Sequence, residues 1–211
     1  MFASEGELGF RRLRILLKDI ILLCLESFAA ANHAEFAKAE KLAERALGSA
    51  ERMYGKDHEN IAYVLREYSR VLDLTDKAKA REMLTRALMI TDRVYGKDHH
   101  KAASVLLVLG DTYRFGDTND REKAREVFER ALTILEHAFG RDHEEVYAAL
   151  SKLGSTCSEL GNFGRARELL ERALMIRERV FGKDHEKVHG CFFDPGRQAK
   201  PWRVRSRLYR S

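Results

Sequence analysis

The chain has 211 residues, of which 45% are hydrophobic and 34% charged, with a formal net charge of +5. This composition indicates a globular protein that is rich in helix, and the length is sufficient for one or two hydrophobic cores. The two prolines are Pro195 and Pro201. Residues 1–190 therefore contain no residue that lacks a backbone N–H and would break a helix.

The distribution of charge and the cysteines narrow the class of protein further. Residues 191–211 hold six basic side chains and one acidic one, whereas residues 1–190 hold 32 of each sign. The basic pI of about 9.1 is therefore a property of the tail and does not indicate a basic face on the rest of the chain. The three cysteines share no short spacing, which favours reduced thiols in an intracellular protein; they are Cys24, Cys157 and Cys191.

The N-terminal stretch, residues 1–33, combines three early arginines with an apolar segment at 11–28. This combination superficially resembles a secretory signal or a membrane anchor. The uninterrupted apolar run at 20–25 is only six residues long, which is too short to span a bilayer. We therefore expect residues 1–33 to form an apolar helix that is the buried first helix of the fold. Targeting of the 11–28 segment to a membrane stays open as the alternative.

Residues 34–189 are dominated by one sequence unit that occurs four times. Each copy contains Arg-Ala-Leu and, ten residues after the arginine, Gly-(Lys/Arg)-Asp-His. Successive copies of this tetrapeptide are 41, 44 and 42 residues apart, and we call them the corners; they lie at residues 55–58, 96–99, 140–143 and 182–185. Self-similarity at a fixed period of this size is the signature of a repeat array.

Each corner is predicted to end one helix and to begin the next. Glycine adopts the positive φ that closes a helix without the steric penalty of a Cβ atom. The aspartate two residues later can accept the free N–H groups of the next helix as its N-cap. Asp142 fits this role with a loose capping-box pattern, because Glu145 follows three residues later.

The four aligned corner histidines suggest a metal site at first sight. Neighbouring helix axes lie ~8–10 Å apart, whereas a zinc ligand must lie ~2.0–2.1 Å from the ion. We therefore do not expect histidines from different corners to bind one metal, and we expect them to pack and to cap helices. The sequence predicts no metal site and no cofactor.

Two helical patterns alternate between the corners, and a short turn such as Leu160-Gly161-Asn162 separates them. Two amphipathic helices joined by a short turn form an antiparallel hairpin. Small residues such as Ala166 and Ala173 allow close helix approach, and each hairpin must stack on a neighbour to bury its apolar surface. The copy between residues 98 and 140 has two extra residues at 116–121, which we expect to lengthen the turn and to leave the helices in phase.

These patterns resemble the tetratricopeptide repeat. The chain matches the consensus of this repeat at Leu109-Gly110 with Tyr113, Ala124, Phe128 and Ala131. It matches it again at Leu153-Gly154 with Cys157, Ala166, Leu170 and Ala173. The period near 42 and the segments RALMIRERVFGKDHEKV and RALTILEHAFGRDHEEVYAAL are similar to the long repeat of kinesin light chains. The resemblance implies an all-α fold, an α–α superhelix of antiparallel helix hairpins, over residues 34–189.

The resemblance also implies a peptide-binding surface, since the first helices of successive hairpins line a concave groove in this family. When Tyr68, Leu109 and Leu153 are aligned, the groove-facing positions are Tyr63, Arg66, Arg70, Asp73, Leu107, Asp111, Arg114, Ser151, Ser155 and Ser158. Arginine is suited to bidentate capture of carboxylates. We therefore predict that the 63–73 end meets acidic residues of a protein or peptide partner. The alternative is that these side chains form only a solvated helix surface.

Residues 190–211 depart from the repeat pattern, because composition, charge and proline content all change there. We expect a basic, disordered tail, and three interpretations stay open. The tail could cover the last apolar face with its aromatic side chains, or bind nucleic acid or an anionic membrane as a basic arm. The third interpretation, which we favour, is that the chain is a truncated form of a longer repeat adaptor; its uncapped C-terminal end would then be available for oligomerisation.

No motif in the sequence indicates catalysis. It contains no Gly-rich phosphate loop, no Gly-x-Ser-x-Gly and no clustered metal-ligand spacing. We therefore predict a cytoplasmic, non-catalytic scaffold that binds a protein partner and has no small-molecule substrate. The alternative function is that of a basic-tailed nucleic-acid- or membrane-associated protein in which the repeats serve as a spacer.

Overall fold

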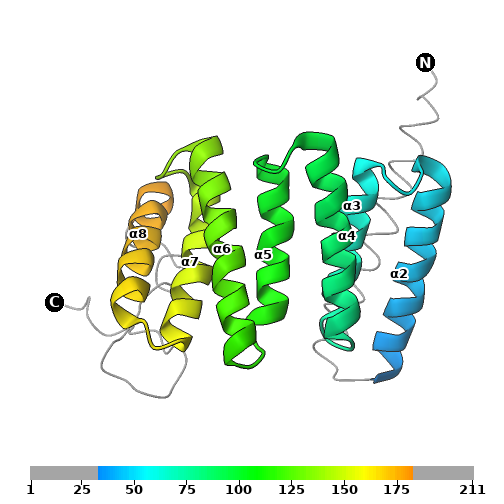
Figure 1. The fold of residues 1–211 in the computed structure, drawn as a ribbon, viewed down its shortest axis with the longest axis horizontal. Coiled ribbons are helices and arrows are strands. Elements are labelled where there is room, and N and C mark those ends of the chain that lie inside the picture. Colours follow the sequence, from blue (N-terminus) through cyan, green and yellow to red (C-terminus); the bar gives the residue numbers. More distant parts are fainter. Residues whose placement is uncertain (1–32, 183–211) are drawn as a thin grey trace. The chain divides into compact units, whose positions relative to one another are not determined.

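The computed structural model describes residues 33–182, and all regular structure in this range is helical (Figure 1). The helices are α2 (His33–Tyr54), α3 (Glu59–Leu72), α4 (Lys77–Tyr95), α5 (His100–Arg114), α6 (Thr118–Phe139), α7 (Glu144–Glu159) and α8 (Phe163–Phe181). The predicted all-α hairpin fold is confirmed. The expected helix within residues 1–33 and the tail at 190–211 lie outside the described residues. Within the described part of the chain, no helix is long and apolar enough to cross a membrane.

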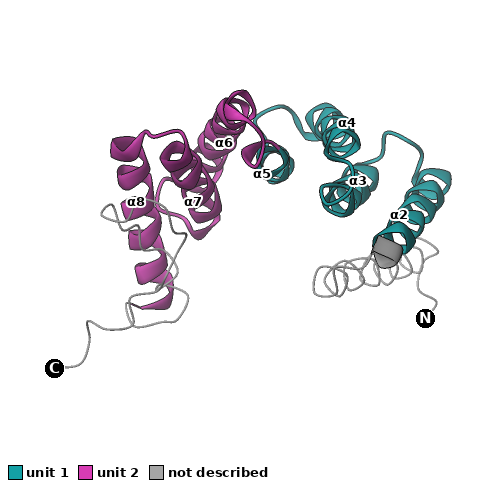
Figure 2. Ribbon diagram, turned by 90° about the horizontal axis from the view of Figure 1, so that it is seen from below, with its two compact units in different colours: residues 1–112 teal, residues 113–211 magenta. Residues whose placement is uncertain are grey.

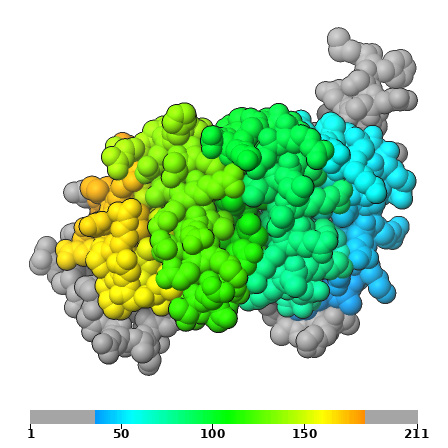
Figure 3. All heavy atoms as spheres, viewed as in Figure 1, coloured from blue at the N-terminus to red at the C-terminus, as the bar shows by residue number. Residues whose placement is uncertain are grey.

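The chain divides into two compact units, residues 1–112 and residues 113–211 (Figure 2). In the first unit α2 packs on α3 and α3 on α4, and in the second unit α6 packs on α7 and α7 on α8. In the space-filling view, the helices of each unit form adjoining bands of colour that follow the sequence order (Figure 3). We call α3, α5 and α7 the first helices and α4, α6 and α8 the second helices of their hairpins.

The second helices share one pattern of buried residues, counted back from the corner glycine. Positions 16, 12, 9 and 6 residues before that glycine hold alanine, a large apolar residue, alanine and isoleucine. All are buried; in chain order they are Ala80, Leu84, Ala87 and Ile90, then Ala124, Phe128, Ala131 and Ile134, then Ala166, Leu170, Ala173 and Ile176. Small residues at two of the four positions permit close helix packing, as the sequence predicted.

The approach of α7 to α8 is close enough to require a glycine. A Cβ atom added at Gly154 would lie 2.8 Å from the Cγ atom of Leu170, well inside van der Waals contact. Gly154 therefore belongs to the packing of this hairpin, since its missing side chain is the space that Leu170 fills.

The corner glycines close the preceding helices with a positive φ, as predicted. The φ values of Gly55, Gly96, Gly140 and Gly182 are +84°, +92°, +89° and +82°. At Gly96, Gly140 and Gly182, ψ is 154° to 158°, a backbone region that residues with a side chain essentially never occupy. The glycine N–H still donates to the carbonyl four residues back, for example from Gly96 to Asp92 at 3.0 Å.

The corner histidine, and not the aspartate, caps each following helix in the described corners. The Nδ1 atoms of His58, His99 and His143 each accept the backbone N–H two residues later at 3.2 Å. The prediction that Asp142 and its equivalents are N-caps is therefore wrong. The helix begins immediately after the histidine, so the aspartate is one residue too early to reach the free N–H groups.

Each of the three corner histidines within residues 33–182 also stacks on the aromatic residue four positions earlier. The ring centroids of the pairs Tyr54–His58, Tyr95–His99 and Phe139–His143 are 5.0, 4.8 and 5.1 Å apart. This contact fixes the ring plane while Nδ1 accepts the backbone N–H. The expected packing and capping role of the corner histidines is confirmed for these three corners.

The two extra residues of the third copy lengthen a helix and not the turn. Helix α6 has 22 residues, whereas α4 and α8 have 19 each. Asp117 caps α6 by accepting the N–H of Asp120 at 2.8 Å, so the helix begins inside the segment that we expected to be a longer turn. The expected loop insertion is therefore wrong, although the second helices stay in phase at their corner ends.

Candidate functional site

Helix α3 presents the charged part of the predicted groove. Tyr63, Arg66 and Arg70 follow one another at intervals of three and four residues, which places them on one face of a helix. Tyr63 is 45% exposed, and the side chains of Arg66 and Arg70 are 25% and 66% exposed. The three residues thus form an accessible strip of aromatic and basic groups.

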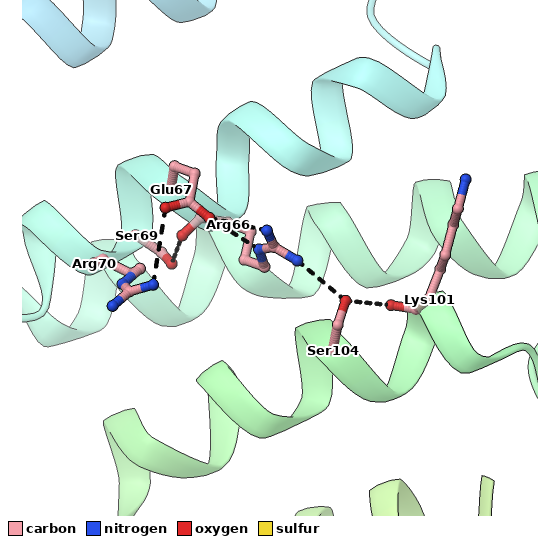
Figure 4. Close-up of polar contacts among 6 residues, drawn as sticks. All are labelled: Arg66, Glu67, Ser69, Arg70, Lys101 and Ser104. Carbon is pink, nitrogen blue, oxygen red and sulfur yellow. Dashed lines mark hydrogen bonds and ion pairs between the residues drawn. The ribbon is translucent and has the colours of Figure 1, made fainter. Parts of the chain in front are cut away.

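Arg66 is held in one orientation by contacts on several sides (Figure 4). Its Nε and Nη2 atoms donate to Oε1 of Glu67 at 3.1 and 2.9 Å, and Nη1 donates to Oγ of Ser104 at 3.2 Å. The guanidinium carbon lies 4.9 Å from the ring centroid of Tyr63, within the range of a cation–π contact. A guanidinium fixed in this way is a preorganised group of N–H donors.

Glu67 connects the two arginines of α3. Its side chain is only 5% exposed, and its second oxygen, Oε2, lies 3.9 Å from Nη1 of Arg70 (Figure 4). The distance to Arg70 is too long for a hydrogen bond. The same carboxylate therefore binds Arg66 firmly and Arg70 loosely.

The bond from Arg66 to Ser104 places the faces of α3 and α5 side by side. Ser104 itself donates to the backbone oxygen of Lys101 at 2.8 Å, so its oxygen is available as the acceptor for Arg66 (Figure 4). The Nζ atom of Lys101 lies 3.2 Å from Oε2 of Glu59 on α3. The first helices of two successive hairpins thus form one continuous polar surface.

An aspartate lies immediately after the C-terminal end of α3. Asp73 follows the last residue of the helix as its C-cap, and its Oδ1 atom is buried with no hydrogen-bond partner among the described residues. Burial raises the pKa of Asp73, and the nearby charge of Asp111 adds to this rise, while Lys77 and Arg81 oppose it. The predicted residues Asp73 and Asp111 are therefore electrostatic neighbours on α3 and α5.

The predicted positions in the second unit have a different character. Arg114 donates from Nε to both oxygens of Glu159, at 3.0 and 3.2 Å, and its side chain is only 17% exposed. Ser155 is 8% exposed, and its hydroxyl donates to the backbone oxygen of Ser151 at 2.9 Å. Ser151 and Ser158 are half-buried on α7, and Leu107, which lies on α5 in the first unit, is half-buried as well. These positions therefore present little unpaired charge to a binding partner, since the only arginine among them is paired with Glu159.

Sequence reasoning missed Glu67 and Ser104, which hold Arg66 in place. Glu67 precedes Arg70 by three residues, a helical spacing at which opposite charges attract. Ser104 has in its repeat the same distance from the corner glycine that Tyr63 has in the previous one. The register that selected Tyr63 could therefore also have selected Ser104.

Two open cavities lie elsewhere, both in the second unit. One, of about 480 Å³, is lined by residues of α6, α7 and α8 together with Arg141, and its polar lining combines three glutamates with three arginines. The other, of about 430 Å³, is lined by α7 and α8 and contains Tyr147, whose ring centroid lies 3.9 Å from the Arg177 guanidinium carbon. Among the described residues, no three histidine, cysteine or acidic side chains gather as a set of metal ligands.

Known repeats and structures are similar to this chain. Two sequence profiles, both described as tetratricopeptide repeat, match residues 78–137 and 117–179 in one case and 27–60 in the other. These ranges cover more than half of the chain. No curated protein matches the chain in sequence at a significant level.

Solved structures of similar fold include proteins from two organisms. BtubC (BKLC) from P. vanneervenii superimposes with a TM-score of 0.61 at 21% identity, over 91% of this chain and 70% of that chain. Two crystal structures of a putative kinesin light chain from Podosopora anserina, with nearly identical TPR-like repeats, give TM-scores of 0.59 and 0.58 at 16% identity. They cover 84% of this chain and 94% and 95% of theirs. At these identities the likeness shows the fold alone.

Proposed function

Because the chain belongs to the tetratricopeptide-repeat family, with repeats similar to those of kinesin light chains, we propose that it binds an acidic peptide segment of a protein partner. The proposed binding surface is the exposed face of the first helices, and its principal contacts are Tyr63, Arg66 and Arg70. Folds of this kind serve many functions, so the proposal depends on the chemistry of this surface. In this proposal the protein is a non-catalytic, cytoplasmic scaffold.

The observation that carries the proposal is the fixed guanidinium of Arg66. Arginine has five N–H donors, and three of them are used in the bonds to Glu67 and Ser104. Two N–H groups are left without an acceptor in the described part of the chain, on a side chain whose orientation is already set. Preorganised donors bind a carboxylate with less loss of conformational entropy than mobile ones.

Arg70 and Tyr63 extend this surface along α3. Arg70 is 66% exposed and can turn toward a partner, whereas Tyr63 offers an exposed ring for apolar contact. Within the first unit, Leu107 and Asp111 of α5 are proposed as a continuation of this surface. The predicted positions of the second unit, Arg114, Ser151, Ser155 and Ser158, are proposed as less charged positions that make shape contacts. Asp73 marks the acidic limit of the basic strip.

The test compares capture of protein partners from native lysate by the intact chain and by an Arg66→Glu/Arg70→Glu double variant. We expect one partner to be captured by the intact chain and lost in the double variant. The matched control is Arg165→Glu/Arg167→Glu, which makes the same change of charge at two exposed arginines of α8. Equal capture by all three proteins would refute the assignment of the surface.

A third protein, lacking residues 191–211, separates the alternative function from this one. Binding of nucleic acid or anionic vesicles that weakens steeply with salt and disappears with the tail would favour the basic-arm hypothesis. Partner capture that persists without the tail supports the groove.

A further inference from the structure

The carboxylate of Glu67 occupies the place at which the proposed partner would bind. It is the most buried acidic side chain of the residues whose exposure is described, and it lies between the two arginines of the basic strip (Figure 4). A partner's carboxylate would approach the same two guanidinium groups.

We infer that Glu67 is an internal competitor, a carboxylate of the protein itself that limits the affinity of the Arg66–Arg70 strip for acidic peptides. The inference rests on the proposed function and adds a regulating residue to it. Removal of the Glu67 charge should therefore strengthen the binding of an acidic peptide.

The geometry at Arg66 supports this competition. Nε and Nη2 form the side of the guanidinium that can hold a carboxylate through two parallel bonds, and both donate to Oε1 of Glu67. A partner's carboxylate is left with the other edge, where Nη1 already donates once to Ser104. Glu67 thus takes the better of the two binding edges.

The geometry at Arg70 shows which arginine the partner can recruit more easily. The 3.9 Å separation between Arg70 and Glu67 is an ion pair without a hydrogen bond, and the Arg70 side chain is 66% exposed. Because the pair has no hydrogen bond and its arginine is mostly exposed to water, Arg70 can leave Glu67 more easily than Arg66 can. Arg66 donates two bonds to Glu67.

The charge of Glu67 acts on the partner as well as on the arginines. With Glu67 ionised, the three side chains carry a net charge of +1, and without that carboxylate they carry +2. A buried charge is screened by salt much less than an exposed one. The Glu67 carboxylate therefore repels an incoming acidic residue even while it orients Arg66.

The repeat itself does not require an acidic residue at this position. The equivalent residues, at the same distance from the corner glycine, are Val108 in α5 and Lys152 in α7. Since two other first helices fold with different side chains there, the choice of glutamate in α3 concerns the two neighbouring arginines.

The test uses the full chain and a fluorescein-labelled decapeptide of alternating glutamate and alanine, with a glutamine–alanine decapeptide as the neutral counterpart. Dissociation constants are measured by fluorescence anisotropy at several salt concentrations for the wild type and for Glu67→Gln. The amide oxygen of glutamine can still accept from Arg66, so the variant removes the charge and keeps a partner for the guanidinium. We expect the acidic peptide to bind roughly three- to tenfold more tightly, with no change for the neutral one.

Glu59→Gln is the matched control, because it removes one negative charge from the same helix at a residue that pairs with Lys101. We expect less than about a twofold change from it. Glu67→Val, which installs the residue found at the equivalent position of α5, is the second variant in case Glu67→Gln loses helical signal. It should also favour the acidic peptide over the neutral one.

The outcomes distinguish this inference from the proposed function. If the wild type prefers the acidic peptide, Arg66→Glu/Arg70→Glu abolishes the preference and the folded Glu67 variants bind no more tightly, the internal competitor is refuted and the binding surface stands. If the wild type and the Glu67 variants show no preference for the acidic peptide, the proposed surface itself is wrong.

Discussion

Helices α3 and α7 hold the same place in their hairpins, and their buried sides match position by position. Ile61, Leu65 and Tyr68 of α3 correspond to Val146, Leu150 and Leu153 of α7, and all six are buried. Their other sides differ, since α3 carries Arg66 and Arg70, which a glutamate holds, whereas the equivalent positions of α7 are Ser151 and Ser155, and Ser155 is buried and bonds to its own helix. The repeat constrains the side that packs and leaves the other side free to acquire a specific partner chemistry.

The two helices also differ in a small residue that faces the second helix of the hairpin. Fourteen residues after the corner glycine, α3 has Ser69, which is fully buried, and α7 has Gly154. The large apolar residue at the equivalent position of the second helix is leucine in both hairpins, Leu84 and Leu170. The neighbouring residue is therefore of the same type in both hairpins, and in the α7–α8 hairpin its side chain lies where a Cβ atom of residue 154 would be.

The largest effect is expected when the serine of α3 is placed into α7. In Gly154→Ser, the new Cβ atom would lie 2.8 Å from Cγ of Leu170, so either the Leu170 side chain or helix α8 must shift. We expect a loss of about 2–3 kcal/mol in the free energy of unfolding, measured by urea denaturation.

The reciprocal change, Ser69→Gly, creates no such clash and should cost only about 1 kcal/mol, through the flexibility of glycine in a helix. Equal losses from the two substitutions would show that the hairpins do not differ at this position.

The next largest loss of stability is expected for a contact that occurs in both units, between an arginine of the second helix and the preceding corner. Arg172 donates to Glu136 and to the backbone oxygen of Arg141 in the preceding corner, and Arg86 makes the same pair of contacts with Glu51 and Lys56. Arg86→Ala and Arg172→Ala should each lower the free energy of unfolding by about 1–2 kcal/mol, because each removes charge-assisted hydrogen bonds at a partly buried site.

The comparison variant for these arginines is Arg167→Ala. Arg167 forms an exposed i, i+4 pair with Glu171, and its loss should cost less than about 0.5 kcal/mol. If Arg86→Ala and Arg172→Ala cost no more than Arg167→Ala, the contacts between repeats do not contribute to stability.

The smallest effect extends the comparison to α5 through its histidine cap. Burial lowers the pKa of His99, and the nearby charges of His100 and Lys101 lower it further. The unprotonated form of His99 stabilises the fold. Its contribution to the free energy of unfolding is fully present above the ordinary histidine pKa near 6.5, and it is lost as the pH falls through the lower pKa of His99 in the folded state. Protonation removes the Nδ1 acceptor, so we expect a loss of up to ~1 kcal/mol on acidification.

The measurement is the free energy of unfolding of the wild type and of His99→Asp between pH 7.5 and pH 5. Aspartate caps a helix without titrating in this range, so the variant should lose less stability on acidification than the wild type does. His137→Gln, at an exposed histidine near the end of α6, should leave the pH profile unchanged. A profile for His99→Asp identical to that of the wild type would contradict the role of the cap.

The architecture could be predicted from the sequence because it depends on local signals that recur four times. Helical spacing and the corner glycines are such signals, and both were sufficient. The cap was assigned to aspartate, one residue too early, because the aspartate and the histidine are adjacent and the pattern does not fix the first helical residue. An aromatic residue four positions before each corner histidine, as in Tyr54–His58, was the signal that could have identified the cap.

The candidate site was predictable only in part. The register placed Arg66 and Arg70 on the exposed face of α3, since a helix fixes which residues share a face. The spacing of Glu67 and Arg70 was a local signal for their pairing. The register could not indicate that Ser155 would be buried or that Ser104 would accept from Arg66, because these depend on the packing of one helix on another.

The longer helix α6 has a consequence for how such a chain can change its length. The buried positions of α4, α6 and α8 keep the same distance from the corner glycine that follows each helix. The C-terminal end of each of these helices is therefore fixed by the packing, whereas the N-terminal end can vary in length. Residues added near Asp117 therefore shift nothing in the core, and a foreign epitope or a labelling tag inserted there should be accommodated as extra helix. The same tolerance offers evolution a position at which one repeat can be lengthened without disturbing its neighbours.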